Sequence, residues 1–325
     1  MKALVYTGAK TLDLRDVPDP VPAAGDALVT VAHVGICGSD MHAWAGHDDR
    51  RPAPLILGHE AAGVTAEGVR VTVNPLVTCG TCHDCRDGRE NLCAARQIIS
   101  MPPREGAFAE QLAIPRGNLV AVPDHVSTQV AALTEPLACG WHAVRLAARI
   151  LHRPPEEARC LVLGGGAIGL GAALALVARG AREVHIAEPG AARRAVVMAA
   201  GDFHVFDPRA GSGPDGVDLV VDGVGFEATR AAACRAVRPG GVIAHIGLGS
   251  AEGGLDVRRM TLQEITVFGT YTYTMADFRE TAAAVFDGRL GALDWIETRP
   301  LSEGDRAFDD IAAGRVAAPK LILVP

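Results

Sequence analysis

The sequence predicts an α/β protein that combines a doubly wound, parallel sheet of the Rossmann type with a second domain that is mostly β. The first part, up to about residue 134, contains β-branched runs such as 2–6 and 28–34, separated by prolines and glycines. From Thr134 onward, short apolar runs alternate with helical patterns, which is typical of a parallel sheet flanked by helices. A length of 325 residues allows about two domains of roughly 150 residues.

The second part is expected to alternate strands and helices. The strands are predicted at 160–163, 183–187, 219–221, 242–246 and 266–270, and the helices between them at 168–179, 191–200 and 227–237. Continuous apolar strands such as 219–221 suit a sheet that is buried on both faces. An amphipathic helix at 277–287 and a short strand at 321–324 complete the chain.

Composition and charge exclude several classes of protein. The 38 Asp and Glu outnumber the 31 Lys and Arg, so no general basic field exists to hold nucleic acid. Residues 1–6 do not resemble a secretory signal, and we expect a cytoplasmic protein with reduced thiols. The uncharged stretch 160–178 is long enough to suggest a membrane span, but a glycine cluster interrupts it, so we expect strand, turn and helix.

The glycine cluster matches the dinucleotide-binding pattern G-x-G-x-x-G over 164–169. Gly164 would form the tight turn, Gly166 would admit a pyrophosphate to the backbone, and Gly169 would allow close packing of helix on strand. The backbone N–H groups of the helix start, including Ala167 and Ile168, would face the phosphates. A glycine-rich turn without a ligand is the alternative interpretation.

Glu188 decides which dinucleotide is expected. It follows Gly166 by 22 positions and stands at the end of the next predicted strand, where a carboxylate accepts hydrogen bonds from the adenosine ribose. This arrangement favours NAD over NADP, because the carboxylate would repel a 2′-phosphate. Arg193 and Arg194 lie close enough to serve a 2′-phosphate instead, so NADP stays the less favoured alternative.

Four cysteines are spaced as C-x2-C-x2-C-x7-C, at Cys79, Cys82, Cys85 and Cys93. Four thiolates on a short, turn-rich loop suit a closed tetrahedral zinc site. Disulfides fit poorly in a reducing compartment, and an iron–sulfur cluster is a minority alternative. A site whose four ligands all come from protein leaves no place for substrate, so we expect this zinc to be structural.

A second set of metal-ligand residue types is dispersed along the chain. It consists of Cys37 within Gly35-Ile36-Cys37-Gly38-Ser39-Asp40-Met41-His42, of His59 and Glu60 after Gly58, and of Glu135 before Pro136. Each has an ordinary alternative: a buried thiol, a core histidine or a surface acid. Spacing alone does not show that they converge in space.

The motifs, taken together and in this order, make the chain resemble the zinc-dependent medium-chain dehydrogenase/reductase family, closest to its sorbitol (polyol) dehydrogenase branch. The resemblance implies that Cys37 and His59 bind a catalytic zinc. It implies that Glu60 and Glu135 ligate this zinc or hold its water; the alcohol dehydrogenase branch has a cysteine where Glu135 stands. Two zinc ions per chain are therefore expected.

The resemblance also assigns the supporting residues. Ser39 matches the hydroxyl that takes the substrate proton, and His42 matches the outward end of that relay. Asp40 matches a carboxylate that orients the ligating histidine. Lys320 falls near a basic residue that meets the cofactor pyrophosphate. Trp44, His47 and Asp48 follow the Cys37 motif and either line the pocket or form an exposed loop.

The family pattern further implies a discontinuous architecture. A GroES-like catalytic domain with the zinc lobe would cover 1–138, the NAD-binding Rossmann domain 139–272, and a return segment 273–325 would complete the catalytic domain. A homodimer or homotetramer is expected. The segment between Gly63 and Asn74 is shorter than in relatives, which bears on strand geometry there.

The sequence thus predicts NAD-dependent oxidation of a secondary alcohol, such as a polyol, sugar alcohol or cyclitol. The same chemistry on threonine or a simple alcohol shares every motif. Two further hypotheses are a non-catalytic sensor that binds NAD and zinc, and a zinc-free reductase acting on quinones or enones. Neither nucleic acid nor a membrane is an expected partner.

Overall fold

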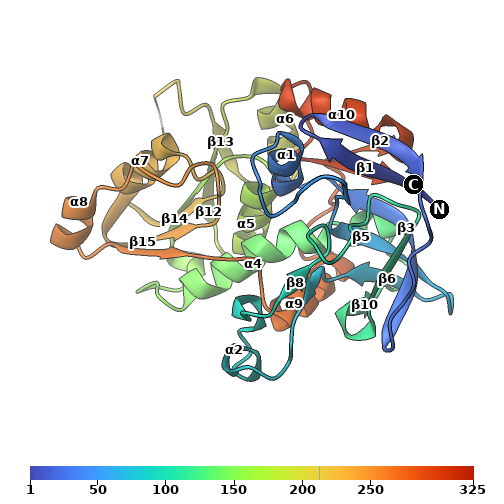
Figure 1. Cartoon of the computed structure of the whole chain (residues 1–325). Coiled ribbons are helices and arrows are strands. Elements are labelled where there is room, and N and C mark those ends of the chain that lie inside the picture. Colours follow the sequence, from blue (N-terminus) through green and yellow to red (C-terminus); the bar gives the residue numbers. More distant parts are fainter. Residues whose placement is uncertain (212) are drawn as a thin grey trace.

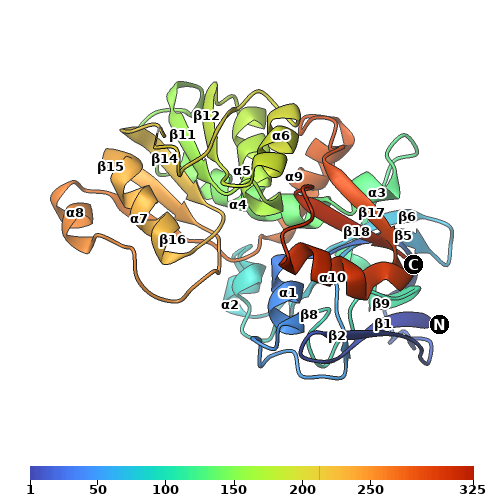
Figure 2. The ribbon, with the colours of Figure 1, turned by 90° about the horizontal axis from the view of Figure 1, so that it is seen from above.

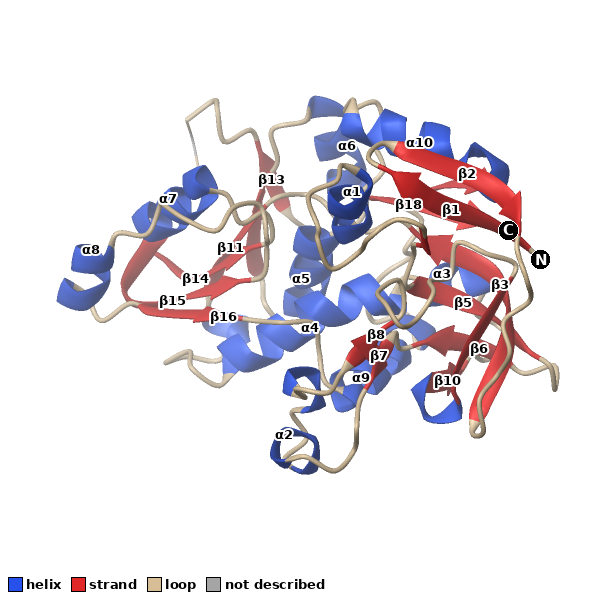
Figure 3. Ribbon diagram, viewed as in Figure 1, coloured by secondary structure: helices blue, strands red, loops and turns tan. Residues whose placement is uncertain are grey.

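Two lobes lie side by side in the computed structural model, which describes residues 1–211 and 213–325 (Figures 1 and 2). One lobe is mostly β and contains both the N- and C-terminal segments, whose ends lie near each other in both views. The other holds a parallel sheet with helices on its faces (Figure 3). The long helix α4 (Thr134–Ala148) lies between them.

The β-rich lobe is built on a sheet in the order β10-β6-β5-β3-β18-β17, with β9 also paired to β3. Its N-terminal elements are β1 (Lys2–Gly8), β2 (Thr11–Asp16), β3 (Asp26–Gly35), α1 (Gly38–Trp44), β4 (Leu55–Ile56), β5 (Glu60–Thr65), β6 (Arg70–Val73), β7 (Leu76–Val77), α2 (His83–Arg86), η1 (Glu90–Leu92), β8 (Gln97–Ile98), β9 (Gln111–Pro115), η2 (Arg116–Asn118), β10 (Leu119–Ala121) and α3 (Thr128–Ala131). The short segment between β5 and β6 forms a tight hairpin with regular antiparallel register, from Ala62 opposite Thr72 to Val64 opposite Arg70.

The C-terminal segment returns to this lobe. Its elements are α9 (Met275–Phe286), β17 (Ile296–Pro300), η4 (Leu301–Glu303), α10 (Gly304–Ala312) and β18 (Lys320–Val324). Strand β18 pairs antiparallel with the end of β3, with Ile322 opposite Gly35. The predicted domain boundary at 138 falls within α4, and that at 272 falls in the link between β16 and α9. The exact division of the chain stays a prediction.

The parallel sheet has the order β13-β12-β11-β14-β15-β16, which is the order 3-2-1-4-5-6 of a dinucleotide-binding domain. Its elements, after η3 (Pro155–Glu157), are β11 (Arg159–Leu163), α5 (Ala167–Ala178), β12 (Glu183–Ala187), α6 (Ala191–Ala199), β13 (His204–Phe206), β14 (Val217–Asp222), α7 (Glu227–Ala236), β15 (Val237–His245), α8 (Val257–Leu262) and β16 (Thr266–Gly269). Cys160 and Val162 of β11 pack into one core, and Leu161 and Leu163 into another. Both faces of the sheet are therefore buried, as its continuous apolar strands predict.

The predicted elements are present, with shifts of one or two residues at their ends, except that β15 starts five residues earlier than predicted. Helix α9 starts at Met275, two residues earlier than predicted, because the Thr274 hydroxyl accepts a hydrogen bond from the N–H of Asp277 and caps the helix. Strand β15 starts at Val237 because a bulge lets this residue pair with Val217. Among the described residues, none of the helices is long and apolar enough to cross a bilayer.

Gly140 sets how closely α4 can approach α5, and this predicts a packing defect. A Cβ at Gly140 would lie 2.5 Å from the backbone nitrogen of Ala172 in α5. Overpacking of this kind costs about 1–3 kcal/mol, so we expect Gly140→Ala to lower the free energy of unfolding by that amount in a urea titration. Gly117→Ala is the control, because a Cβ there meets nothing within 4 Å. Equal stability of the two variants would contradict the packing argument.

Candidate active site

The first part of the site forms where β3 gives way to α1. Cys37 is the N-cap of α1, and its backbone N–H donates to Oδ2 of Asp40 at 3.0 Å. The Asp40 carboxylate is completely buried, and its Oδ1 accepts from the N–H of Gly58 at 3.2 Å. One side chain thus joins the loop that carries Cys37 to the loop that carries His59.

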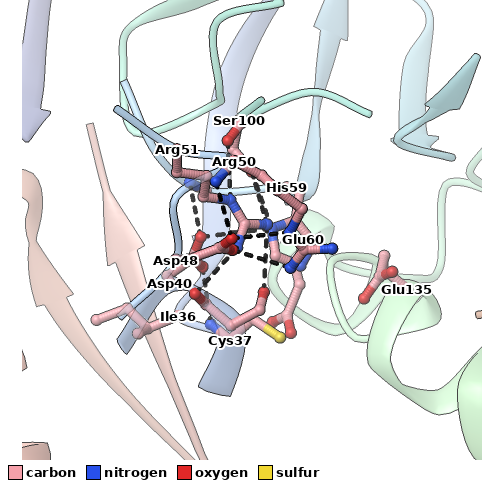
Figure 4. Close-up of polar contacts among 12 residues, drawn as sticks. Ile36, Cys37, Asp40, Asp48, Arg50, Arg51, His59, Glu60, Ser100 and Glu135 are labelled. Atoms are coloured by element: carbon pink, nitrogen blue, oxygen red, sulfur yellow. Dashed lines mark hydrogen bonds and ion pairs between the residues drawn. The ribbon is translucent and has the colours of Figure 1, made fainter. Parts of the chain in front are cut away.

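His59 and Glu60 stand at the start of β5, opposite the end of β3. Oδ1 of Asp40 lies 3.4 Å from Nδ1 of His59, and the Ser100 hydroxyl lies 3.4 Å from the same nitrogen. Two neighbours therefore engage Nδ1, which leaves Nε2 for a metal ion. The ligand atoms of Cys37, His59 and Glu60 all lie within 4.8 Å of one another (Figure 4), and we call this set the triad.

Glu60 is fully buried, and its two oxygens have different surroundings. Oε1 accepts from Nζ of Lys320 at 2.6 Å, while Oε2 has no hydrogen-bond partner among the described residues. A Cβ at Gly35 would lie 2.0 Å from Oε2, so only glycine leaves room for this carboxylate. An unpartnered buried carboxylate oxygen is costly, and a cation at the triad would satisfy it.

Lys320 completes this charge arrangement. Its ammonium is buried, and besides Glu60 it contacts the carbonyl oxygen of Ile36 at 2.8 Å. Burial alone would lower the pKa of Lys320, but the charges of Glu60 and Cys37 raise it above its usual value. The contacts of Lys320 thus lie at the triad, and a contact with a pyrophosphate stays a prediction.

The charges of the site also affect Asp40 and His59. Burial opposes ionisation of Asp40, but the charge and hydrogen bond of His59 lower the pKa of this carboxyl below its ordinary value. Burial likewise disfavours the imidazolium, yet Asp40 and Cys37 raise the pKa of His59 well above its usual range. A ligating histidine must be neutral, so metal binding here has to release a proton.

Glu135 belongs to the first turn of α4 and stands apart from the triad (Figure 4). The carboxyl is buried, and the hydroxyl of Tyr273 donates to its Oε1 at 2.6 Å. Burial raises the pKa of Glu135 to about 7, although the charge of His59 opposes this rise. The structure therefore brings Glu135 close to the other predicted ligands, without placing it among them.

The predicted relay residues lie on α1. Ser39 is half-buried and His42 is exposed, and no hydrogen bond joins these two described side chains. Arg51, which the sequence reasoning missed, donates to the carbonyl of Ser39 at 3.0 Å and lies 3.4 Å from its hydroxyl. Arg51 is also paired with Asp48. Trp44 is buried against Phe308, whereas His47 is exposed and Asp48 is half-buried in the loop that follows α1.

The four-cysteine lobe, residues 79–96, has the geometry of a tetrahedral metal site. The four sulfurs lie within 4.8 Å of one another, with Cys79–Cys85 at 3.9 Å and Cys79–Cys93 at 3.6 Å. Zinc–sulfur bonds of about 2.3 Å imply sulfur–sulfur distances of about 3.8 Å in a tetrahedron. All four thiols are free, so the disulfide alternative is not supported.

Two of the four thiols have pKa values that are shifted in opposite directions. Hydrogen bonds from the backbone N–H groups of Thr81 and Cys82 lower the pKa of Cys79 to about 6. Burial and the neighbouring thiols raise the pKa of Cys85 to about 12. A divalent cation at the centre of the four-cysteine lobe would favour ionisation of all four thiols.

The glycine motif has the expected form between β11 and α5. Gly164 has φ +96° in the turn, and Gly166 is the N-cap of α5. A Cβ at Gly169 would lie 1.9 Å from the carbonyl oxygen of Gly164, whereas one at Gly166 would meet nothing within 4 Å. The N–H groups of Ala167 and Ile168 belong to the first turn, beside this open space.

Glu188 directly follows β12 and is buried. Its carboxylate accepts hydrogen bonds from the N–H groups of Gly165 at 2.9 Å and Gly190 at 2.7 Å, which places it beside the glycine turn. Arg193 donates to the carbonyls of Val316 and Ala317 in the β-rich lobe. Arg193 therefore has a contact between the lobes, which the sequence reasoning did not foresee.

Comparison with known proteins identifies the class to which this fold and these donor sets belong. Residues 23–124 match the family model described as alcohol dehydrogenase GroES-like domain, and residues 167–287 match zinc-binding dehydrogenase. The chain belongs to the zinc-dependent medium-chain dehydrogenase/reductase family, in its polyol dehydrogenase branch, and it is an oxidoreductase.

Several relatives are similar over most of the chain. L-galactonate-5-dehydrogenase of Escherichia coli K12 is 32% identical, covering 90% of this chain and 89% of its own. Sorbitol dehydrogenase of Bacillus subtilis 168 is 32% identical over 84% and 82%. L-threonine 3-dehydrogenase of Saccharopolyspora erythraea is 32% identical over 97% of each. A solved structure from Sinorhizobium meliloti 1021, bound to NADP, is 29% identical with a TM-score of 0.89 over 100% and 99%.

The glycine motif predicts different defects for substitutions at Gly166 and at Gly169. Gly166→Val adds side chain only to open space, so we expect a normally folded protein whose Kd for NADH rises by on the order of a hundredfold, about 2.7 kcal/mol. Gly169→Ala meets backbone, so we expect lost thermal stability as well. Fluorescence titration with NADH and thermal unfolding measure both. Unchanged NADH binding in Gly166→Val would contradict the assigned role of the turn.

Proposed function

We propose that this chain catalyses hydride transfer between a secondary alcohol, of the polyol or sugar-alcohol class, and NAD at a zinc site formed by Cys37, His59 and Glu60. The convergence of these three side chains within 4.8 Å carries the proposal, because two segments of the chain meet there and supply one thiolate, one imidazole and one carboxylate. The relatives named as galactonate and sorbitol dehydrogenases support the substrate class.

The donor set fits zinc in the catalytic role. A thiolate, an imidazole and a carboxylate match the donors of catalytic zinc sites, and the buried, unpartnered Oε2 of Glu60 is an acceptor that a cation would satisfy. When bound, zinc supplies a Lewis acid that favours loss of the alcohol proton; for water, the shift from about 15.7 to about 7 corresponds to about 12 kcal/mol. The four-cysteine lobe would hold a second, structural zinc.

The chain's own residues orient the site and move the proton. Asp40 fixes the His59 ring through Nδ1, and Lys320 holds Glu60 by Oε1. Arg51 fixes Ser39, whose hydroxyl we propose as the first proton acceptor. His42, exposed on the same helix, would release the proton to solvent, since an unperturbed imidazole titrates near pH 6.5.

The surroundings of Glu188 support NAD as the preferred cofactor. The carboxylate lies beside the glycine turn, where it would accept from the adenosine ribose and repel a 2′-phosphate. The nearby Arg194 is engaged with Asp207, and Arg193 with backbone carbonyls, so neither is poised for a phosphate.

The location and the oligomeric state of the protein are also proposed. The eight cysteines are free thiols, which supports a cytoplasmic location. We propose a homodimer or homotetramer from the family resemblance.

Metal analysis tests the division into two sites. We expect two zinc ions per chain, one after Cys37→Ala and one after Cys85→Ala, because each substitution removes a ligand from a different group. Cys37→Ala should lose turnover and keep its fold by circular dichroism. Cys234→Ala is the control, since this cysteine packs in the core of the parallel sheet. A single zinc in the parent would instead favour the zinc-free reductase hypothesis, and full activity of Cys37→Ala would refute the catalytic assignment.

A substrate panel tests the reaction. We expect NADH absorbance at 340 nm with at least one of sorbitol, xylitol, galactitol, L-galactonate, a cyclitol or 2,3-butanediol, and a lower kcat/KM with NADP than with NAD. L-Threonine and ethanol are included because they require the same chemistry and a threonine dehydrogenase is among the relatives. Turnover of L-threonine alone would replace the polyol assignment, and no turnover in either direction would favour the sensor hypothesis.

A further inference from the structure

The link between β16 and α9, residues 270–274, is held by the four-cysteine lobe. Nδ2 of Asn91, which is buried beside Cys93, donates to the carbonyl oxygen of Tyr271 at 2.8 Å. Oε1 of Glu90 accepts from the N–H of Met275, the first residue of α9, at 2.5 Å. The guanidinium of Arg96 lies 4.8 Å from the centre of the Tyr271 ring. Three side chains of one short stretch therefore fix this link.

Tyr273, in the middle of the link, carries the contact to Glu135. Its side chain is 1% exposed and packs with Ala138 of α4 and Phe278 of α9, so the ring has one position. Its hydroxyl donates to Oε1 of Glu135 at 2.6 Å.

The hydrogen bond from Tyr273 engages the carboxylate of Glu135, which could otherwise bind a metal ion at the triad. Glu135 is buried and lies to one side of Cys37, His59 and Glu60, outside the triad (Figure 4). A catalytic zinc site needs a position that substrate can take, and a free carboxylate nearby is a strong ligand for that position.

We propose that Tyr273 is a positioning residue that holds Glu135 back from the triad, and that the four-cysteine lobe, through Asn91 and Glu90, determines where Tyr273 stands. The proposal rests on the proposed function in taking the triad as the catalytic metal site. The four-cysteine lobe would then act beyond its own stability. It fixes the link that carries Tyr273, and Tyr273 sets the position of Glu135 beside the triad.

The fold itself does not depend on this hydrogen bond. Helices α4 and α9 are joined independently by Asp277, whose Oδ2 lies 2.7 Å from Nδ1 of His142 and 2.9 Å from Nη2 of Arg145. Tyr273→Phe keeps the ring and removes only the hydroxyl, so the packing against Ala138 and Phe278 is retained. We therefore expect this variant to fold.

The test compares Tyr273→Phe with Tyr271→Phe in full-length protein that carries Co²⁺ at both metal sites. Tyr271→Phe is the matched control, because no hydrogen bond to its hydroxyl is found within residues 1–211 and 213–325 and its carbonyl still meets Asn91. The four-sulfur site contributes equally to each visible spectrum, so the difference from the parent spectrum reports the triad. The measurement needs no substrate.

We expect Tyr273→Phe to shift the cobalt absorption bands and, with an alcohol that the parent oxidises, to raise KM on the order of tenfold with a smaller change in kcat. Tyr271→Phe should keep the parent spectrum, and Asn91→Ala should show the shift of Tyr273→Phe at smaller amplitude. NADH affinity should be unchanged in all three.

Two results would overturn the proposal. Coincident spectra for Tyr273→Phe and Tyr271→Phe would show that the phenol does not position Glu135, and a parent-like spectrum for Asn91→Ala would remove the role of the lobe. Failure of the proposed function looks different: the parent would then oxidise no alcohol, while the spectral comparison among the variants would still decide the role of Tyr273.

Discussion

The buried carboxylate of Asp40 is the constraint on which the catalytic site depends. It accepts from the backbone of Cys37 and of Gly58 and lies beside Nδ1 of His59, so a single anion joins two segments. A buried carboxylate requires such partners, because burial without them costs several kcal/mol. The hydrogen bonds that stabilise the Asp40 charge therefore also position the Cys37 thiol and the His59 imidazole. The same interaction contributes to folding and to the geometry of the proposed metal site.

Opposite charge from the C-terminal segment completes the arrangement. The antiparallel pairing of β18 with β3 brings the ammonium of Lys320 to Glu60, next to the strand that ends before Cys37. Glycine at position 35 leaves the space that the second oxygen of Glu60 occupies. The β-rich lobe thus contributes both the proposed ligands and their counter-charge, while the parallel sheet contributes the open turn at Gly166 that we propose for the nucleotide.

The features that the sequence predicts well are those whose residues are neighbours along the chain. The turn at Gly164 and the cluster around Cys79 depend on local spacing, and both have the expected form. The hydrogen bond of Tyr273 to Glu135 joins residues 138 positions apart. The hydrogen bond of Arg51 to the Ser100 carbonyl joins two loops that carry no recognisable motif. No sequence pattern predicts either contact. Lys320 combines both cases. The sequence predicts the C-terminal strand at 321–324, but the contact of the Lys320 ammonium with Glu60 depends on the register of β18 against β3, which the sequence does not reveal.

The pairing of Lys320 with Glu60 also has a consequence for biosynthesis. The two residues are 260 positions apart, so at about 5–20 residues per second the ribosome needs about 13–50 s to supply the lysine after the glutamate. The entire parallel sheet, from β11 to β16, is made within that interval. During this time the parallel-sheet domain can fold as a unit, while Glu60 has no Lys320 to pair with. The ion pair of Lys320 with Glu60 therefore forms only after the whole parallel sheet has been synthesised.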